Sequence, residues 1–276
     1  MNIPVTVIIP CYNQGYFLLE ALESLKRCDS RLFEIIIIDD GSTDPDTLRI
    51  LDDVRASGYQ VVRQENKGLS GARNTGIRSA TTAFLLFLDA DNKVRPGFFT
   101  KGIEILSNDP TVSVVYGNGE YFGDQSGIRK QGPFNLQKQL LVNYIDACAM
   151  VRRSVFDRVG YFDEHMRSGW EDWEMWLRIA FAGDRFVYVD DVFFDYRVRN
   201  DSMSKAVFAY RERVNAIENY VYAKYPDKMG MHHVIDFLSD RFRRNPIGFL
   251  AKLIMRTYFP GRYDRMLKAN KIRNGL

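Results

Sequence analysis

Asp89 and Asp91 are the residues of this sequence whose type and spacing best suit a chemical role. They directly follow a run of five apolar residues, 84–88, and Asn92 comes after them. Side chains alternate along a strand with a period of two, so both carboxylates can face the same side where the strand ends. Two oxygen donors there suit a divalent metal that keeps its waters and a substrate phosphate. The same Asp-x-Asp-Asn pattern also fits an ordinary polar turn.

Polar residues of a similar kind follow two other apolar runs. Residues 5–9 lead into Pro10-x-Tyr12-Asn13, and residues 34–38 lead into Asp39-Asp40-Gly41-Ser42-x-Asp44. In open α/β sheets, ligands bind beyond the carboxyl ends of parallel strands. The sequence therefore predicts that all three groups converge on one ligand.

The elements that must position these groups alternate between strand and helix. Strand-length apolar runs occupy residues 5–9, 34–38, 60–63, 84–88 and 112–116, and helical periodicity fills 16–26, 45–57, 68–80 and 96–107. Asp44 followed by Pro45 is typical of a helix N-terminus. This alternation predicts an α/β domain with a mostly parallel central sheet flanked by helices.

The second half has a mixed pattern. We expect a polar loop over 124–140, a helix over 170–182, strands at 186–189 and 192–198, and mostly helix from Ala206 onward. Gly117-Asn118-Gly119 resembles the start of a dinucleotide-binding motif but does not match it. The third glycine, Gly123, falls one position late, and no helix pattern begins there. No phosphate-binding P-loop sequence occurs anywhere in the chain.

Composition indicates an ordinary globular protein. The 276 residues are 46% hydrophobic and 26% charged, which is enough to bury a full core. The three cysteines, Cys11, Cys28 and Cys148, form no paired motif, as expected in a reducing cytosol. The N-terminus lacks a signal-peptide pattern, and no apolar run is long enough to cross a membrane. These features predict a cytoplasmic protein and are compatible with a homo-oligomer.

The motifs in combination resemble the family 2 glycosyltransferases, over about residues 3–205. Beside the three strand ends, they include Asn66-x-Gly68-x-x-x-Ala72-Arg73-Asn74-x-Gly76-Ile77, Gly160-x-Phe162-Asp163-Glu164, and Glu171-Asp172 before Trp173. The resemblance implies a GT-A fold in residues 1–205, with a nucleotide-sugar half (1–115) and an acceptor half (116–205). Residues 206–276 would form a helical, basic extension.

The resemblance implies a set of donor-binding residues. Asp40 would accept a hydrogen bond from the base of a nucleotide-diphosphate sugar. UDP- and dTDP-sugars are the expected partners, because one carboxylate can accept from a pyrimidine N3–H. The other donor-binding residues would be Pro10, Tyr12, Asn13, Asn66, Arg73, Asp89 and Arg199. Asp91, with Asp89, would bind Mn²⁺ or Mg²⁺ at the diphosphate. Arg199 stands where related sequences often carry a histidine, so the third metal ligand stays open.

The resemblance implies that Asp172 is the general base of an inverting transfer and that Trp170 and Glu171 belong to the acceptor site. The acceptor would be a saccharide or a lipid-linked saccharide used in cell-surface polysaccharide or glycolipid synthesis. A structural interpretation also remains, since Ser168-x-x-Glu171 fits a capping box. Trp173 and Trp176 have the spacing of core residues. The alternative function is a non-catalytic nucleotide-sugar-binding or scaffold subunit.

The C-terminal part carries most of the positive charge. The chain's net charge is +3, but residues 241–276 hold ten basic residues and one acid, which leaves the first 240 residues net negative. Apolar residues at helical spacing over 246–259 predict a basic amphipathic helix. Such a helix suits the anionic inner face of a membrane, where the enzyme would bind peripherally. Packing on protein is the equal alternative, and nucleic acid is not expected as a partner.

Overall fold

The computed structural model describes residues 4–199, 211–230 and 242–259, together with residues 235, 238, 239, 262, 263 and 266. Its first half alternates strands and helices as predicted. The elements are β1 (Val5–Cys11), α1 (Gly15–Leu25), β2 (Phe33–Asp39), α2 (Pro45–Ala56), β3 (Gln60–Arg63), α3 (Gly68–Ser79), β4 (Phe84–Phe87), β5 (Lys93–Val94) and α4 (Pro96–Asn108). The predicted N-cap is confirmed, because the Asp44 carboxylate accepts from the Thr47 backbone N–H.

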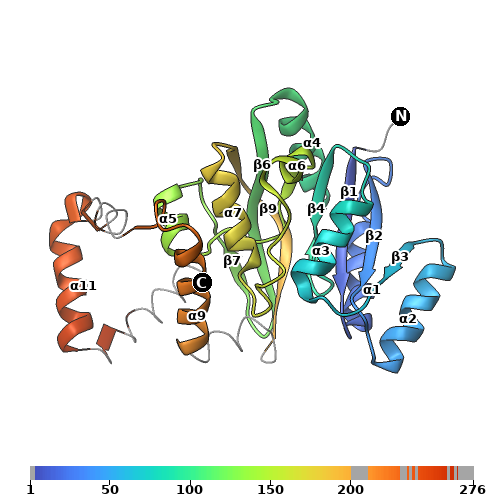
Figure 1. Cartoon of the computed structure of the whole chain (residues 1–276), viewed down its shortest axis with the longest axis horizontal. Coiled ribbons are helices and arrows are strands. Elements are labelled where there is room, and N and C mark those ends of the chain that lie inside the picture. Colours follow the sequence, from blue (N-terminus) through green and yellow to red (C-terminus); the bar gives the residue numbers. More distant parts are fainter. Residues whose placement is uncertain are drawn as a thin grey trace.

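The second half continues with β6 (Val112–Gly123), β7 (Gly127–Arg129), α5 (Leu136–Leu141), β8 (Met150–Arg152), α6 (Ser154–Val159), α7 (Glu171–Phe181) and β9 (Arg185–Val198). Strands β3, β2, β1 and β4 run parallel in that order. The sheet then continues through β8, β6, β9 and β5 with mixed directions, and β7 pairs with β6. The strands up to β4 thus form a parallel sheet, and the later strands extend it with mixed directions (Figure 1).

Alternating side chains of the strands build a core on each face of the sheet. Val5, Val7 and Ile9 of β1 pack in one cluster with α1, α2 and α4. Ile8 points to the other face and packs in a second cluster with α3, α6 and α7. This alternation follows from the two-residue period of a strand. Both faces are buried, which explains why these strands read as continuous apolar runs.

The predicted loop over 124–140 is wrong in part. Strand β6 runs on through Gly117 and Gly119, and residues of 124–140 form β7 and α5. The glycines belong to the strand because the rings of β9 lie over them. A Cβ on Gly117 would come within 2.6 Å of Phe193, and one on Gly119 within 2.9 Å of Phe194. Strand β9 is also a single strand where two were predicted.

Helix α9 (Arg211–Lys224) lies beyond the predicted domain boundary and packs against the catalytic-domain helix α7. Ile217 and Val221 of α9 share a buried cluster with Trp173 and Leu177 of α7. Lys224 donates to the fully buried carboxylate of Glu174 at 2.7 Å. Within the described part of the chain, α9 therefore behaves as an element of the domain core.

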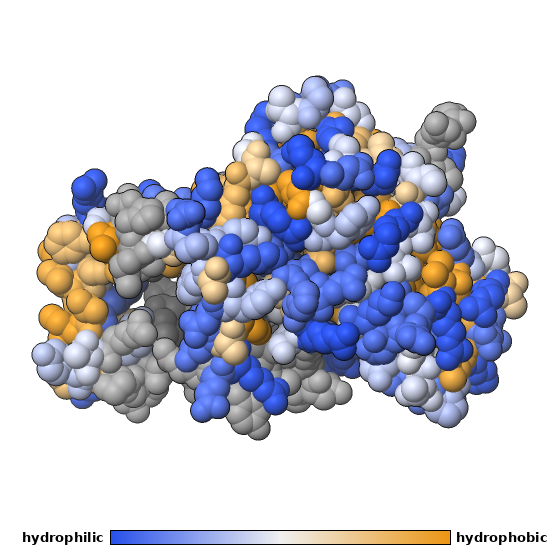
Figure 2. Space-filling view, viewed as in Figure 1, coloured by the Kyte–Doolittle hydropathy of each residue, from blue (hydrophilic) through white to orange (hydrophobic). Residues whose placement is uncertain are grey.

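Helix α11 (Pro246–Tyr258) stands apart from the sheet, beyond α9 and α5 (Figure 1). Hydrophobic side chains gather over it in the space-filling view (Figure 2), and Ile247 is 84% exposed. The predicted helix at 246–259 is therefore confirmed, with its apolar side chains outward. None of the described helices combines the length and the apolar character needed to span a bilayer.

Candidate functional site

A cavity of about 490 Å³ lies at the carboxyl ends of β1, β2 and β4, where the three polar groups of the sequence meet. Eight of the predicted site residues line it, namely Pro10, Tyr12, Asp40, Asn66, Asp89, Asp91, Glu171 and Arg199. Asn13, Arg73, Trp170 and Asp172 are absent from that lining. The predicted convergence on one ligand site is therefore seen for most of the set.

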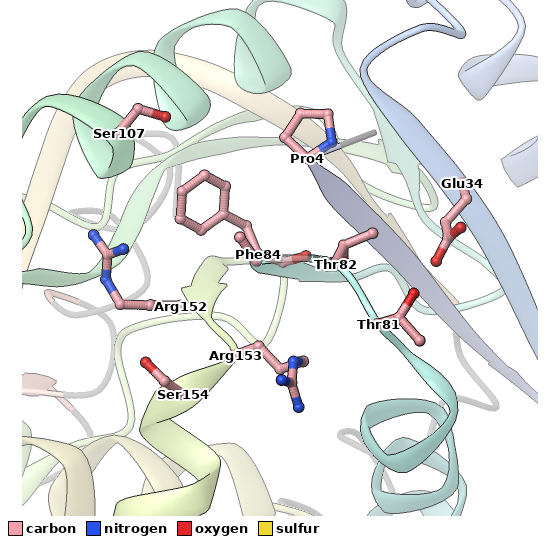
Figure 3. A pocket seen from close by; sticks show the side chains of 10 residues that line it. Pro4, Glu34, Thr81, Thr82, Phe84, Ser107, Arg152, Arg153 and Ser154 are labelled. Atoms are coloured by element: carbon pink, nitrogen blue, oxygen red, sulfur yellow. Dashed lines mark hydrogen bonds between the residues drawn. The ribbon is translucent and has the colours of Figure 1, made fainter. Parts of the chain in front are cut away.

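A larger hollow, of about 890 Å³, lies at the opposite end of the strands (Figure 3). It contains none of the predicted site residues, and two of its polar side chains, Thr82 and Arg152, have structural partners. The Thr82 hydroxyl lies 2.7 Å from the hydroxyl of Thr6. The guanidinium of Arg152 donates to the carbonyl oxygens of Leu106 and Val112. Size alone therefore does not locate the site, and the residues favour the smaller cavity.

Asp40 is placed to receive a polar ligand group. It is 3% exposed, and its Oδ1 accepts from Gln64 Nε2 at 2.7 Å and from the Lys67 backbone N–H at 2.9 Å. The neighbouring Asp39, not Asp40, makes the turn bond, because its Oδ1 accepts from the Ser42 backbone N–H. The turn is therefore built by Asp39, whereas Asp40 lines the cavity.

Gly41 brings Asn66 close to Asp40. Its φ is 75°, and a Cβ at this position would lie 2.8 Å from the backbone nitrogen of Asn66. Only glycine tolerates both the left-handed backbone and so close an approach. The sequence Asp-Asp-Gly-Ser thus fits the geometry that places Asn66 in the cavity wall.

Asn13 holds a loop instead of lining the cavity. Its backbone is left-handed, with a φ of 53°, which asparagine tolerates better than most residues. Its Oδ1 accepts from the backbone N–H groups of Thr43 and Asp44 at 2.8 and 2.9 Å. The side chain predicted to bind donor is therefore used to fix the β2–α2 connection next to Tyr12.

Arg73 is fully buried and joins the two halves of the domain. One guanidinium nitrogen donates to Asp89 Oδ1 at 2.7 Å, and another contacts Glu171 Oε1. Burial by itself would lower the pKa of Arg73, but the charges of Asp89 and Glu171 raise it above the ordinary value. The predicted contact of Arg73 with the donor is not what the geometry favours, since the guanidinium is occupied by these two acids.

Asp89 and Asp91 lie together at the end of β4. Burial and the charge of Asp89 raise the pKa of Asp91 to about 6. Arg199 lies 3.4 Å from Asp91 Oδ2, and the Nε of Arg197 donates to the Asp91 carbonyl oxygen. Two partly buried carboxylates that repel one another suit a hard divalent cation. Among the residues that the structure describes, no three acidic, histidine or cysteine side chains form a metal site.

A strained backbone precedes the acidic pair of α7. Gly169 and Trp170 have φ values of 99° and 62°, and tryptophan rarely adopts the left-handed region. Trp170 is the N-cap residue and makes no capping bond with its side chain. The predicted capping box is therefore wrong, because the helix starts later and Glu171 contacts Arg73. Such strain is often stored at functional sites.

Asp172 follows at the edge of the cavity and is partly exposed. Its Oδ1 accepts from Asn143 Nδ2 and from the Trp173 backbone N–H, both at 2.8 Å. Burial first, and then the charges of Glu171 and Asp146, raise the pKa of Asp172 to about 8. Position at a helix N-terminus would by itself lower this pKa, so burial and the two neighbouring acids outweigh that effect.

The tryptophans divide as the sequence predicts. Trp173 and Trp176 are buried in the core. Trp170 is partly exposed and lies edge-on to Trp173, with ring centroids 5.6 Å apart.

Sequence reasoning missed three residues at this site. Arg167 and Arg197 line the cavity, and Asn143 contacts Asp172. Arg197 belongs to Tyr196-Arg197, so its place beside Arg199 could have drawn attention to it. Nothing in the sequence around Asn143 marks it, because its partner lies 29 positions away.

Comparisons with known proteins point to one family. Residues 6–160 match the sequence profile of the family described as Glycosyl transferase family 2. YwdF of Bacillus subtilis (strain 168), an uncharacterized glycosyltransferase, is 26% identical over 219 residues, which cover 75% of each chain. RP339 of Rickettsia prowazekii (strain Madrid E), also an uncharacterized glycosyltransferase, is 25% identical and is matched over 78% of this chain and 69% of its own length.

The fold has a solved counterpart. TarS of S. aureus, in its complex with UDP-GlcNAc, superimposes with a TM-score of 0.62 over 82% of this chain and 72% of that one, at 20% identity. The predicted GT-A fold is therefore confirmed. Since the family profile covers more than half of the sequence, this chain belongs to glycosyltransferase family 2.

Proposed function

We propose that the protein transfers a sugar from a nucleotide-diphosphate donor to an acceptor hydroxyl with inversion at the anomeric carbon. One observation carries the proposal: the cavity joins the Asp40 loop, the Asp89–Asp91 pair and the start of α7 that bears Asp172. A direct displacement requires a nucleotide pocket, a leaving-group site and a base close together, and here Asp172 directly follows Glu171 of the cavity wall.

In this reaction the acceptor oxygen forms a bond to the anomeric carbon, and the bond from that carbon to the diphosphate oxygen breaks. The electron pair leaves with the diphosphate, and the acceptor proton passes to Asp172. A carboxyl with a pKa of about 8 accepts a proton readily once it is ionised near neutral pH. A single displacement of this kind needs no covalent intermediate on the protein.

The donor is a uridine or thymidine diphosphate sugar. Asp40 lines the cavity with a carboxylate, which can accept from the N3–H of a pyrimidine. Pro10 and Tyr12 form the adjoining wall for the nucleoside, and Asn66 lies beside them. TarS, which shares the fold, binds UDP-GlcNAc, and that likeness supports a uridine nucleotide.

Asp91 and Asp89 would hold Mn²⁺ or Mg²⁺. Their position fits, because both line the cavity, and burial together with the charge of Asp89 raises the pKa of Asp91. A metal ion there supplies positive charge that neutralises the departing diphosphate. Arg199 and Arg197 lie on the same side and add positive charge from the protein itself.

The acceptor is a saccharide or a lipid-linked saccharide of a surface polysaccharide or glycolipid. Glu171 lines the cavity, and Trp170 offers a partly exposed ring next to it for a sugar face. Helix α11 would place the enzyme at an anionic cytoplasmic membrane surface. Its Leu250, Leu253 and Ile254 are about half exposed, and Arg243, Arg244 and Lys252 are exposed near them.

Calorimetry and hydrolysis assays test the proposal. Mn²⁺ with UDP should bind the protein and raise its melting temperature, because a ligand of the native state stabilises it. Slow hydrolysis of the correct UDP- or dTDP-sugar should require Mn²⁺ and should be lost in Asp172→Asn, which should still bind UDP. Binding without turnover in the native protein, across a panel of donors, would favour the non-catalytic alternative.

Sedimentation with liposomes tests the membrane contact. The full chain should sediment with anionic liposomes at low salt and stay in solution with neutral ones, while a chain ending near Ser239 should stay in solution with both. A full chain that never sediments with anionic liposomes would make α11 a protein-binding element.

A further inference from the structure

We propose that Asn143 positions the carboxyl group of Asp172 and serves it as a hydrogen-bond partner in both of its protonation states. Asn143 would thus be a positioning residue of the transfer reaction. The proposal rests on the proposed function to the extent that Asp172 is the base, and it adds a residue that no sequence motif marks.

The first observation is how the bonds of Asp172 are distributed. Asn143 Nδ2 and the Trp173 backbone N–H both donate to Oδ1 of Asp172, each at 2.8 Å. Within the described residues, Oδ2 of Asp172 has no hydrogen-bond partner from the protein. The two donors therefore fix the plane of the carboxylate and leave one oxygen for the proton of an acceptor.

The second observation is an unused acceptor on Asn143 itself. Its Oδ1 is buried and has no partner among the described residues. A buried polar atom without a partner is costly and calls for an explanation. A proton on Oδ2 of Asp172 leaves Oδ1 as an acceptor, so Nδ2 of Asn143 keeps its bond. A proton on Oδ1 instead creates an O–H donor there, and a half-turn of the Asn143 amide would bring its own Oδ1 to that donor. The same side chain then satisfies the ionised and the protonated carboxyl group.

Two further hydrogen bonds anchor the segment that contains Asn143. The neighbouring Tyr144 hydroxyl accepts from the Asn135 backbone N–H at 2.8 Å. On the other side, the indole N–H of Trp173 donates to the carbonyl oxygen of Gln139. Since Trp173 follows Asp172 directly, this second bond ties the segment just before Asn143 to the helix that carries the base.

The charges around Asp172 explain why a neutral donor matters there. Glu171 on α7 and Asp146 before β8 are both acidic, and Arg73 of α3 opposes them. Arg129 of β7 is already paired with Asp146. Burial and the two acids disfavour the ionised form of Asp172, whereas the bond from Asn143 favours it. Asn143 therefore keeps the base usable near neutral pH without adding charge.

The native protein offers the most direct test. In ¹⁵N NMR, the side-chain amide of Asn143 should change its chemical shift with the pKa of Asp172, near pH 8, and this titration should vanish in Asp172→Asn. An Asn143 amide that is unaffected by the ionisation of Asp172 would overturn the proposal. This measurement needs no substrate and no change at Asn143.

Variants supply the second test. Loss of a hydrogen bond to the charged form should raise the Asp172 pKa by about one unit in Asn143→Ala. Donor hydrolysis at pH 7 should then fall roughly tenfold, since the ionised fraction falls by that factor. Its pH profile should shift upward, and UDP affinity should be unchanged. Asn143→Asp, which adds a like charge, should shift the profile further.

The exposed neighbour Val142 provides the matched control, and Val142→Ala should leave both the pKa and the profile as they are. A fall in activity without a shift of the profile would reduce Asn143 to a structural residue and contradict the proposal. If Asp172→Asn retains hydrolysis while the Asn143 amide still titrates with Asp172, the proposed base is wrong but the coupling stands.

Discussion

Replacing Arg73 by methionine should strongly destabilise the domain, because this buried cation holds two acids together. The side chains of Arg73 and Glu171 are 1% and 5% exposed, and that of Asp89 is 31% exposed. Removing one member of a buried ion pair leaves the other charges without compensation and costs about 3–5 kcal/mol. We expect Arg73→Met to lower the free energy of unfolding by an amount in this range.

An exposed ion pair with the same nitrogen–oxygen distance provides a control within the chain. Arg31 lies 2.7 Å from Asp29, as Arg73 does from Asp89, but the Arg31 side chain is 79% exposed. Exposed pairs of this kind add little, because water and salt screen both charges. Urea unfolding of Arg31→Met should therefore give a free energy close to that of the native protein. An equally small change in Arg73→Met would refute the reasoning.

A double mutant separates the two acids. In Arg73→Met the more buried acid, Glu171, should account for most of the loss, so adding Glu171→Gln should recover part of it. The expected coupling between the two substitutions is about 1–3 kcal/mol. If the two substitutions changed the free energy of unfolding additively, the ion pair between Arg73 and Glu171 would contribute nothing to stability.

Three further predictions concern the cavity and its edge. Asp91→Ala should abolish Mn²⁺-dependent binding of UDP in calorimetric titration while leaving the unfolding transition in place, and undiminished binding would remove Asp91 from the metal site. The pKa of Asp172 is raised from 3.8 to about 8 in the folded state, so between about pH 4 and pH 8 the folded protein holds a proton that the unfolded chain has lost. The free energy of unfolding should therefore fall as the pH rises through that window. In Asp172→Asn, the urea midpoint should fall less over the same pH range. Trp170→Gly should relieve the strain of the left-handed backbone and raise the melting temperature, yet weaken acceptor binding in kinetic assays. A lower melting temperature would show that the contacts of the indole ring contribute more to stability than the strain costs.

The parallel half of the fold was predictable because its signals are local. Apolar runs of strand length, helical periodicity between them and the Asp44–Pro45 start of α2 all lie within a few residues of one another. The convergence of Asp40, Asp89 and Asp91 then followed from the rule that parallel strands present their carboxyl ends at one edge. The sequence therefore placed the nucleotide side of the cavity without any knowledge of contacts.

The acceptor half was less predictable because long-range packing decides it. Gly117 and Gly119 look like loop residues, yet they form strand because Phe193 and Phe194 of β9 occupy the space beside them. Asn13 and Arg73 lie in the motifs expected to bind donor, but the side chain of Asn13 fixes a loop and that of Arg73 pairs with Asp89 and Glu171. Motif position identified the neighbourhood of these residues, whereas only the contacts show what each side chain does.

The same distinction applies to the C-terminal region. Its basic and apolar residues suggested one amphipathic extension, but the described helices have different environments. Helix α9 shares a core with α7, and Lys224 and the Tyr225 that follows α9 both reach the buried carboxylate of Glu174. Helix α11 keeps its apolar side chains exposed (Figure 2). Because α7 carries Asp172 at its start, α9 supports the helix on which the proposed base depends. Of these two described helices, α11 is the one that retains the features of a docking element.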